Sequence, residues 1–192
     1  MKKLIRCLSP SLLVDRFIRI LFRSGLTSAA EAVYYHFKGA STGQLVFFPH
    51  ASGANLWLNP KNYIDRILLN GLQHDPEVVE AFKKEARSGD VFWDVGANIG
   101  LMGLLLSERV SSLHVVAFEP SPLAFAQMFE NNHANSSRMQ LLPFALSTTE
   151  AMMPLSVKIN RNSSQATFLP QDQYNYDTTI PAFCRTGDSV VE

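Results

Sequence analysis

Length, composition and net charge restrict the class of protein before any motif is considered. The 192 residues correspond to one domain, or to one domain with a modest extension. A hydrophobic fraction of 46% with 18% charged residues is typical of a soluble globular protein and argues against intrinsic disorder. The net charge is zero, so the chain as a whole offers no general attraction to nucleic acid or to an anionic membrane.

Cysteine usage and apolar runs indicate the cellular setting. Cys7 and Cys184 lie far apart and belong to no CxxC pair or His/Cys cluster, so we expect neither a disulfide framework nor a metal site. No apolar run approaches the roughly 20 residues that span a bilayer. Arg6 and Pro10 interrupt the apolar stretch after the first three residues, which argues against a signal peptide. The predicted location is cytoplasmic.

The first forty residues differ in charge from the rest of the chain. Residues 1–40 carry a net charge of +5 and the remainder carries −5. Residues 11–23 have the periodicity of an amphipathic helix with a basic face, and packing on the core is the favoured interpretation. Docking of residues 1–24 on a membrane surface or on a partner is the alternative. The apolar face of this predicted helix consists of Leu13, Phe17, Ile20 and Leu21.

The next elements lead into the main domain. We predict a second helix over residues 28–38, two strands over 44–48 and 54–58, and a short helix over 62–69. None of these carries recognisable chemistry. Residues 41–74 are therefore predicted as a strand pair and a short helix that precede the domain.

From residue 75 onward, strands and helices alternate. Asp75 is predicted to cap a helix that has Pro76 at its first position and ends near Gly89. Such alternation predicts an α/β fold of the Rossmann-like class over residues 75–192, with a mostly parallel sheet and helices on both faces. The elements that follow are predicted as strands over 91–95, 114–118 and 139–144, helices over 101–110 and 122–131, and further strands over 154–159 and 180–184.

The turn after the first of these strands reads Asp94-Val95-Gly96-Ala97-Asn98-Ile99-Gly100. Gly96 allows a backbone conformation that most side chains cannot adopt, and Ala97 keeps the turn small enough for a ligand to lie against it. Gly100 allows the next helix to approach the sheet. Dinucleotide enzymes instead use G-x-G-x-x-G beneath a pyrophosphate, which Asp94 would repel. The acid suits a cationic group such as the ammonium of a methionine moiety.

The ends of the next two strands complete the predicted site. Glu119 ends the second strand, where an acid can accept hydrogen bonds from both ribose hydroxyls of a nucleoside, and Pro120 turns the chain away. At the end of the third strand, Phe144 or Leu146 could pack against an adenine ring, and Ala145 could contact it through its backbone. The sequence therefore predicts a nucleoside-type cofactor.

These motifs resemble the FkbM-type family of S-adenosylmethionine-dependent methyltransferases. The resemblance covers residues 75–188 and depends mainly on the stretches from Gly89 to Gly100 and from Phe118 to Pro120. It implies S-adenosylmethionine as cofactor and methyl transfer to a hydroxyl of a sugar or secondary metabolite, with a small-molecule or glycan acceptor. Looser parallels are Asn131 with Asn135, Asn162-Ser163-Ser164, Thr186-Gly187-Asp188, and Glu77, an acid whose place in a first helical turn the helix dipole also favours.

The chain departs from the family at its end. Family members continue into a strand that reads roughly Lys-Ile-Asp-Val-Glu-Gly and lies beside the first strand, whereas this sequence stops at Glu192. We therefore expect a C-terminally incomplete domain, and the alternative to an active enzyme is a non-catalytic or partner-dependent remnant. A third interpretation is an NAD-dependent oxidoreductase. The catalytic base remains unassigned, because no spacing singles out one of His36, His50, His74, His114 and His133.

Overall fold

The computed structural model describes residues 45–50, 52–70, 72–73, 75–159, 165–169 and 175–191. The predicted helices over 11–23 and 28–38 and the turn Asn162-Ser163-Ser164 lie outside the described residues. No helix in the described ranges is both long enough and apolar enough to cross a membrane. The elements, in chain order, are β1 (Val46–Pro49), β2 (Asn55–Leu58), α3 (Tyr63–Leu69), α4 (Pro76–Glu85), β3 (Val91–Val95), α5 (Leu101–Ser107), β4 (His114–Phe118), α6 (Pro122–Ala134), β5 (Met139–Leu142), β6 (Ala145–Leu146), β7 (Ala151–Val157), β8 (Ala166–Thr167), β9 (Thr178–Arg185) and α7 (Asp188–Val191).

The predicted parallel sheet is confirmed. Strands β3, β4 and β5 pair in that order and all run parallel. In this register Asp94 lies opposite Ala117, and Phe118 lies opposite Leu142. The carboxyl ends of the three strands therefore meet at one edge, where ligands bind in open α/β sheets.

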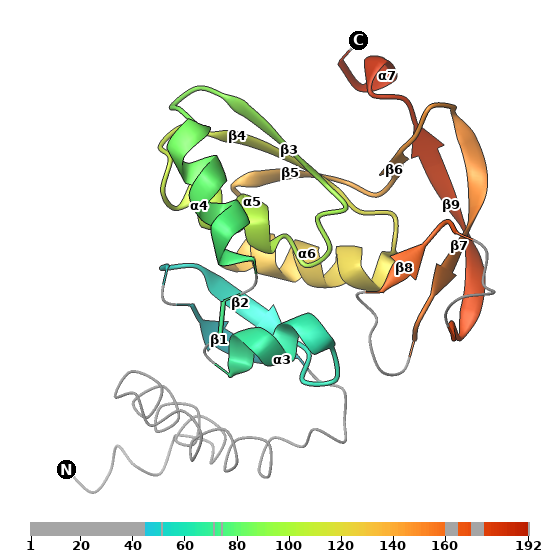
Figure 1. Cartoon of the computed structure of the whole chain (residues 1–192), viewed down its shortest axis with the longest axis horizontal. Helices are drawn as coiled ribbons and strands as arrows, with labels where there is room; N and C mark the ends of the chain where they lie inside the picture. Colours follow the sequence, from blue (N-terminus) through green and yellow to red (C-terminus); the bar gives the residue numbers. More distant parts are fainter. Residues whose placement is uncertain are drawn as a thin grey trace, which may run out of the picture.

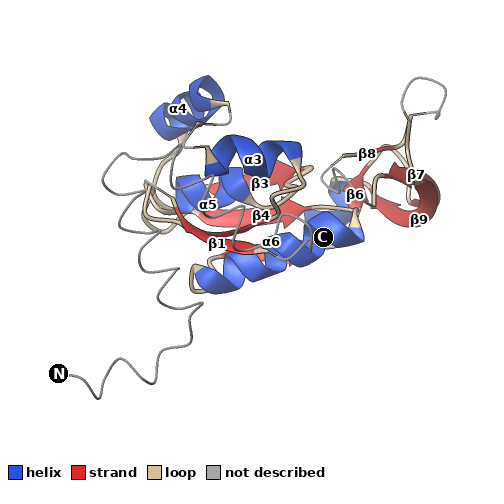
Figure 2. Ribbon diagram, turned by 90° about the horizontal axis from the view of Figure 1, so that it is seen from below, coloured by secondary structure: helices blue, strands red, loops and turns tan. Residues whose placement is uncertain are grey.

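Helices α5 and α6 cover the same face of this sheet, contrary to the expectation of helices on both faces (Figures 1 and 2). A Cβ built on Gly103 of α5 would contact Met139 and Val115 of the sheet, and one on Gly100 would contact Met128 of α6. The reason is strand order: β3, β4 and β5 advance in one direction, so successive right-handed crossovers put their helices on one side. On the other face Val91 and Val95 are 62% and 58% exposed.

A second, four-stranded sheet follows the parallel one and has the order β6-β9-β7-β8. Strand β7 pairs antiparallel with β9 over seven residues, and the two-residue β6 pairs parallel with β9. The predicted strand over 154–159 thus begins earlier, at Ala151, and the predicted strand over 180–184 lies within β9. Because β6 follows β5 almost directly, this sheet stands next to the carboxyl edge of the parallel sheet (Figure 1).

The hairpin of β1 and β2 packs beneath α6 and shares the main core. Leu56 and Leu58 of β2 belong to the same buried cluster as Ile99 and Leu104. The proposed boundary between residues 41–74 and 75–192 therefore separates segments that contribute to one core.

Asn131 of α6 and Asn135, the C-cap residue of that helix, bind the hairpin backbone. Asn131 Oδ1 accepts from the N–H of Trp57 at 2.5 Å, and Asn135 Oδ1 accepts from the N–H of Asn55 at 2.8 Å. Asn135 Nδ2 also donates to the Asn55 carbonyl at 2.7 Å. The paired asparagines therefore attach β2 to α6.

Candidate functional site

The glycine loop between β3 and α5 is held against the end of β4. The N–H groups of Gly96 and Ala97 both donate to the carbonyl of Phe118, at 2.9 and 3.0 Å. Gly96, Asn98 and Gly100 all have positive φ angles, of 75°, 52° and 78°. These conformations favour glycine and, less strongly, asparagine, which accounts for the residue types in the loop.

The two glycines of the loop serve different purposes. A Cβ built on Gly96 would meet no described atom within 4 Å, so this position faces open space. A Cβ on Gly100 would lie 2.9 Å from Met128 Cγ and 2.9 Å from Met139 Cε. Gly96 therefore leaves room for a ligand, whereas Gly100 allows the start of α5 to pack closely on α6 and the sheet.

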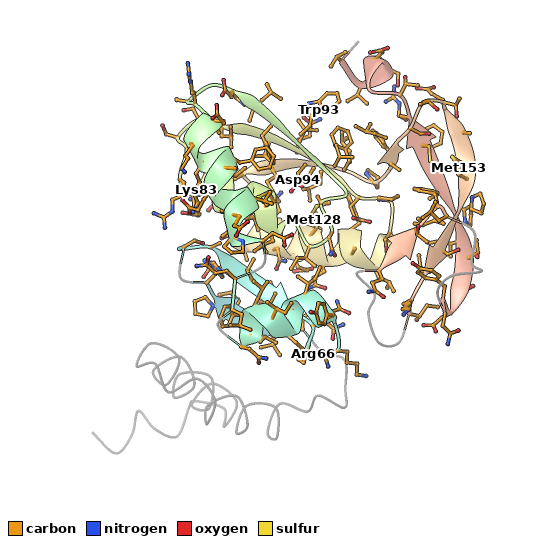
Figure 3. The ribbon with its side chains drawn as sticks, viewed as in Figure 1. Arg66, Lys83, Trp93, Asp94, Met128 and Met153 are labelled. Atoms are coloured by element: carbon orange, nitrogen blue, oxygen red, sulfur yellow. The ribbon has the colours of Figure 1, made fainter. Side chains whose placement is uncertain are left out.

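Asp94 points from β3 toward the helices, on the opposite side of the strand from Trp93 (Figure 3). Its Oδ2 accepts from the N–H of Gly103 at 3.1 Å. Burial raises the pKa of the Asp94 carboxyl, and that hydrogen bond lowers it in part. Gly103 was not predicted to belong to the site, although a glycine inside a helix often marks close packing. A Cβ there would lie 2.6 Å from Met139 Sδ.

Glu119 is buried, with 6% of its surface exposed, and both of its oxygens are oriented by backbone groups. Oε1 accepts from the N–H of Ser121 at 2.7 Å, and Oε2 accepts from the N–H of Asn98 at 2.8 Å. Burial raises the pKa of Glu119, the two hydrogen bonds lower it, and the charge of Asp94 raises it further. A carboxylate has about four lone-pair sites, so each oxygen can still accept one more hydrogen bond.

Two cavities flank the glycine loop, and both are lined by Gly96 and Asn98. The first, of about 320 Å³, is called the Glu119 cavity. The second, of about 220 Å³, is called the Asp94 cavity. The Oδ1 of Asn98 is buried without a hydrogen-bond partner among the described residues. The other lining residues are Val95, Glu119, Pro120, Ala145, Leu146, Leu155, Ala166 and Phe168 in the first, and Ile64, Asp75, Val79, Asp94, Ala97, Ile99, Leu101 and Met102 in the second.

Two predicted site residues lie elsewhere. Phe144 is absent from the described walls of both cavities, because its ring packs between Phe118 and Phe183 at centroid distances of 5.7 and 6.5 Å. Glu77 is exposed in the first turn of α4 and is also absent from those walls. The remaining predicted residues line a cavity, except Gly100, which is buried at the end of the loop.

Asp75, which the sequence predicts to be a helix cap, is a further acid near the site. It stands at the N-cap position of α4, but its side chain makes no cap hydrogen bond, which corrects the prediction that it caps the helix. Its φ of 46° and ψ of 53° are left-handed, whereas a capping side chain requires an extended backbone. Asp75 instead lines the Asp94 cavity, so two carboxylates border that space.

The described histidines His50, His114 and His133 are absent from the described walls of both cavities, and His36 and His74 lie outside the described residues. His50 borders a third cavity between the β1–β2 turn, α4 and α5, together with Lys83. Burial, and then the charge of Lys83, lowers the pKa of His50. Its Nδ1 lies 2.8 Å from Ser52 Oγ.

Comparisons with known proteins support the resemblance inferred from the motifs. No family model matches the chain. Hexuronic acid methyltransferase AglP of Haloferax volcanii is 32% identical over 81 residues, which are 42% of this chain and 33% of AglP. The 31-O-demethyl-FK506 methyltransferase FkbM of Streptomyces tacrolimicus is 47% identical over 47 residues, which are 24% of this chain and 18% of that protein. The resemblance to FkbM-type methyltransferases is thus confirmed as a distant one, and the matched segments span a third or less of these relatives.

Solved structures give weaker likenesses. Trm5b from Pyrococcus abyssi is 22% identical with a TM-score of 0.40, over 53% of this chain and 29% of that one. TYW2 of P. horikoshii, in complex with MeSAdo, is 18% identical with a TM-score of 0.41, over 72% and 51%. With scores this low, neither structure adds to the assignment of the site.

Proposed function

We propose that this chain is the cofactor-binding part of an S-adenosylmethionine-dependent methyltransferase. The observation that carries the proposal is a pair of carboxylates at the ends of adjacent parallel strands: the half-buried Asp94 near the end of β3 and the buried Glu119 directly after β4. Each lines one of the two cavities beside the glycine loop. The cavities beside them share Gly96 and Asn98, so an elongated ligand that lies along the glycine loop would reach both carboxylates.

The Glu119 cavity suits the nucleoside of this cofactor. The carboxylate is oriented by Ser121 and Asn98, so its remaining lone pairs have fixed directions in which two ribose hydroxyls can donate. The open space before Gly96 lets a sugar ring approach the backbone. Hydrogen bonds to a charged group contribute roughly 1.5–3 kcal/mol each.

The Asp94 cavity suits the amino-acid end of the cofactor. A buried carboxylate is stabilised by a nearby cation, and here Asp94 is joined by Asp75. The ammonium of a methionine moiety meets that requirement, whereas a pyrophosphate would be repelled by both acids. This argues against a dinucleotide, and therefore against an NAD-dependent oxidoreductase.

When bound, S-adenosylmethionine supplies an activated methyl group on a positively charged sulfur. The residues of the chain would orient the cofactor at its two ends, and the acceptor would then have to be aligned with the methyl group. The names of the two curated relatives support a hydroxyl-bearing acceptor, a sugar or a secondary metabolite. No catalytic base is assigned among the described residues.

The alternative proposal is a chain that binds the cofactor without turnover, or that needs a partner for it. The observation that favours it is the outer edge of β3, which pairs with β4 alone among the described strands. Methyl transfer from labelled S-adenosylmethionine to glucuronic acid or glucose, with binding measured in parallel, separates the two proposals. Binding without transfer to any acceptor would favour the alternative.

Binding itself is tested against the competing cofactor class. Titration of adenosylhomocysteine and of NADH into the purified chain should give heat for the first ligand alone. Binding of NADH in place of adenosylhomocysteine would overturn the proposed function and favour an oxidoreductase.

A further inference from the structure

The wall of the Glu119 cavity that comes from the second sheet is apolar. Leu155 lies in β7, Ala166 lies in β8, and Phe168 follows β8 directly. The two strands pair antiparallel with Val157 opposite Ala166. These residues belong to a β-hairpin that is distant in sequence from the glycine loop.

This wall is supported by its own small core. Leu155 is 1% exposed and forms a buried cluster with Val157 of the same strand and with Ala182 of the neighbouring strand β9. Ala166 and Phe168 pack against that cluster from the side. Phe168 is half-buried, so part of its ring is supported and part remains accessible.

The Glu119 cavity therefore has two unlike ends. At the loop it presents the carboxylate of Glu119 and the polar side chain of Asn98, whereas toward the hairpin it presents Leu155, Ala166 and Phe168. A purine nucleoside has the same division, with a ribose that offers hydroxyls and a base that offers flat faces. Aromatic rings pack well against bases, by offset stacking or edge-to-face contact.

We infer that the β7–β8 hairpin, through Phe168, forms the base-binding wall of the cofactor site. This inference rests on the proposed function, because it assumes that a nucleoside occupies the Glu119 cavity. The ring of Phe144, the aromatic residue expected from the sequence, packs against Phe118 and Phe183 instead. The second sheet is then part of the site.

Three ligands separate the contributions of base, sugar and amino acid. Adenosylhomocysteine contains all three, 5′-methylthioadenosine lacks the amino acid, and S-ribosylhomocysteine lacks the base. The variant is Phe168→Ala, and the matched control is Leu169→Ala, because Leu169 is the next residue, is 64% exposed and is absent from the described wall. Affinities are measured by calorimetry for the first two ligands and by ligand-observed NMR competition for the third.

We expect Phe168→Ala to weaken both adenine ligands about tenfold, as loss of one base–aromatic contact does. It should leave the affinity for S-ribosylhomocysteine unchanged, and Leu169→Ala should change none of the three. Phe168→Tyr retains the ring and should bind like the wild type, whereas Phe168→Leu, which keeps an apolar side chain for the hairpin core, should bind like Phe168→Ala.

The outcomes distinguish this inference from the proposed function. A wild-type chain that binds none of the ligands would overturn the proposed function and the base wall with it. A wild-type chain that binds adenosylhomocysteine, with Phe168→Leu binding it equally well, would overturn the base wall alone. Equal losses for all three ligands in Phe168→Ala and Phe168→Leu would also overturn it, because the hairpin would then act through the fold.

Discussion

The backbone N–H of Asn98 donates a 2.8 Å hydrogen bond to Oε2 of Glu119, so the loop after β3 is joined to the carboxylate after β4. Asn98 lines both cavities, and this bond uses only its backbone. Its side chain is left with a buried Oδ1 that has no partner among the described residues. Such an atom costs free energy unless a ligand or water satisfies it.

Asn98→Gly isolates the side chain from the backbone bond. Glycine adopts the φ of 52° without strain and keeps the N–H that Glu119 accepts. We expect the free energy of unfolding to change by less than about 1 kcal/mol, while the affinity for adenosylhomocysteine falls about fivefold through loss of one side-chain hydrogen bond. Urea unfolding and calorimetry measure the two effects. Unchanged affinity would remove the side chain from the site.

Gly96→Ala and Gly103→Ala should have opposite profiles. A Cβ on Gly96 enters open space, so the positive φ costs about 1–2 kcal/mol and the added methyl group obstructs the ligand. A Cβ on Gly103 lies 2.6 Å from Met139 Sδ and 2.8 Å from Val115 Cγ1, and overpacking of this kind costs about 1–3 kcal/mol. Urea unfolding with ligand titration should therefore show lost affinity for Gly96→Ala and the larger loss of stability for Gly103→Ala. The reverse ranking would contradict the description of the loop.

Asp75→Asn and Glu77→Gln separate two neighbouring acids. Asp75 lines the Asp94 cavity, whereas Glu77 is exposed on α4. We expect Asp75→Asn to weaken adenosylhomocysteine about fivefold, because an exposed charge–charge interaction contributes up to about 1 kcal/mol. It should leave 5′-methylthioadenosine unaffected, because that ligand has no ammonium. An effect confined to Glu77→Gln would contradict the role of Asp75 and support the prediction made from the family resemblance.

Asp65 of α3 makes the stability of the chain depend on pH. Its Oδ2 accepts from the N–H of Asn59 and from Nε2 of Gln127, both at 2.6 Å, and its side chain is fully buried. Burial raises the pKa of Asp65 from 3.8 to about 6, and the hydrogen bonds lower it only in part.

Because this folded-state pKa exceeds the unfolded value, the folded chain binds the proton more tightly, and the resulting stability is lost as pH rises through about 6. The pKa values of Asp94 and Glu119 are also raised, so these groups make stability depend on pH in the same direction. Both groups are present in the wild type and in Asp65→Asn, so the difference in unfolding free energy between the two proteins isolates the effect of Asp65. We expect Asp65→Asn to gain up to about 3 kcal/mol on the wild type between pH 4 and pH 7, measured by urea unfolding at each pH. A constant difference across that range would contradict the raised pKa.

The parts of the candidate site that could be proposed from the sequence are those that depend on local pattern. The run from Asp94 to Gly100 and the acid Glu119 were identifiable because positive-φ turns demand particular residue types and strand ends recur at regular intervals. Phe168 and Leu155 were not identifiable, because only the pairing of β7, β8 and β9 brings them to the cavity.

Three of the expectations meet tertiary features that the local sequence pattern does not encode. Helices α5 and α6 lie on one face because the order of β3, β4 and β5 does not reverse, and strand order is not encoded in the alternation of elements. Asp75 has the right residue type for a helix cap, but its backbone is left-handed, and its side chain makes no cap hydrogen bond. Phe144 has the right position for a base contact, but its neighbours in space already enclose it.

The most direct test of the central claim is calorimetric titration of S-adenosylmethionine into the wild-type chain, with Asp94→Ala and Glu119→Ala as paired variants. The proposed site predicts micromolar binding by the wild type and a loss of at least about tenfold in each variant, since each removes hydrogen bonds or charge interactions with the ligand. Circular dichroism of the variants verifies that they are folded. No binding by a folded wild-type chain, or binding that survives both substitutions, would contradict the assignment of this site.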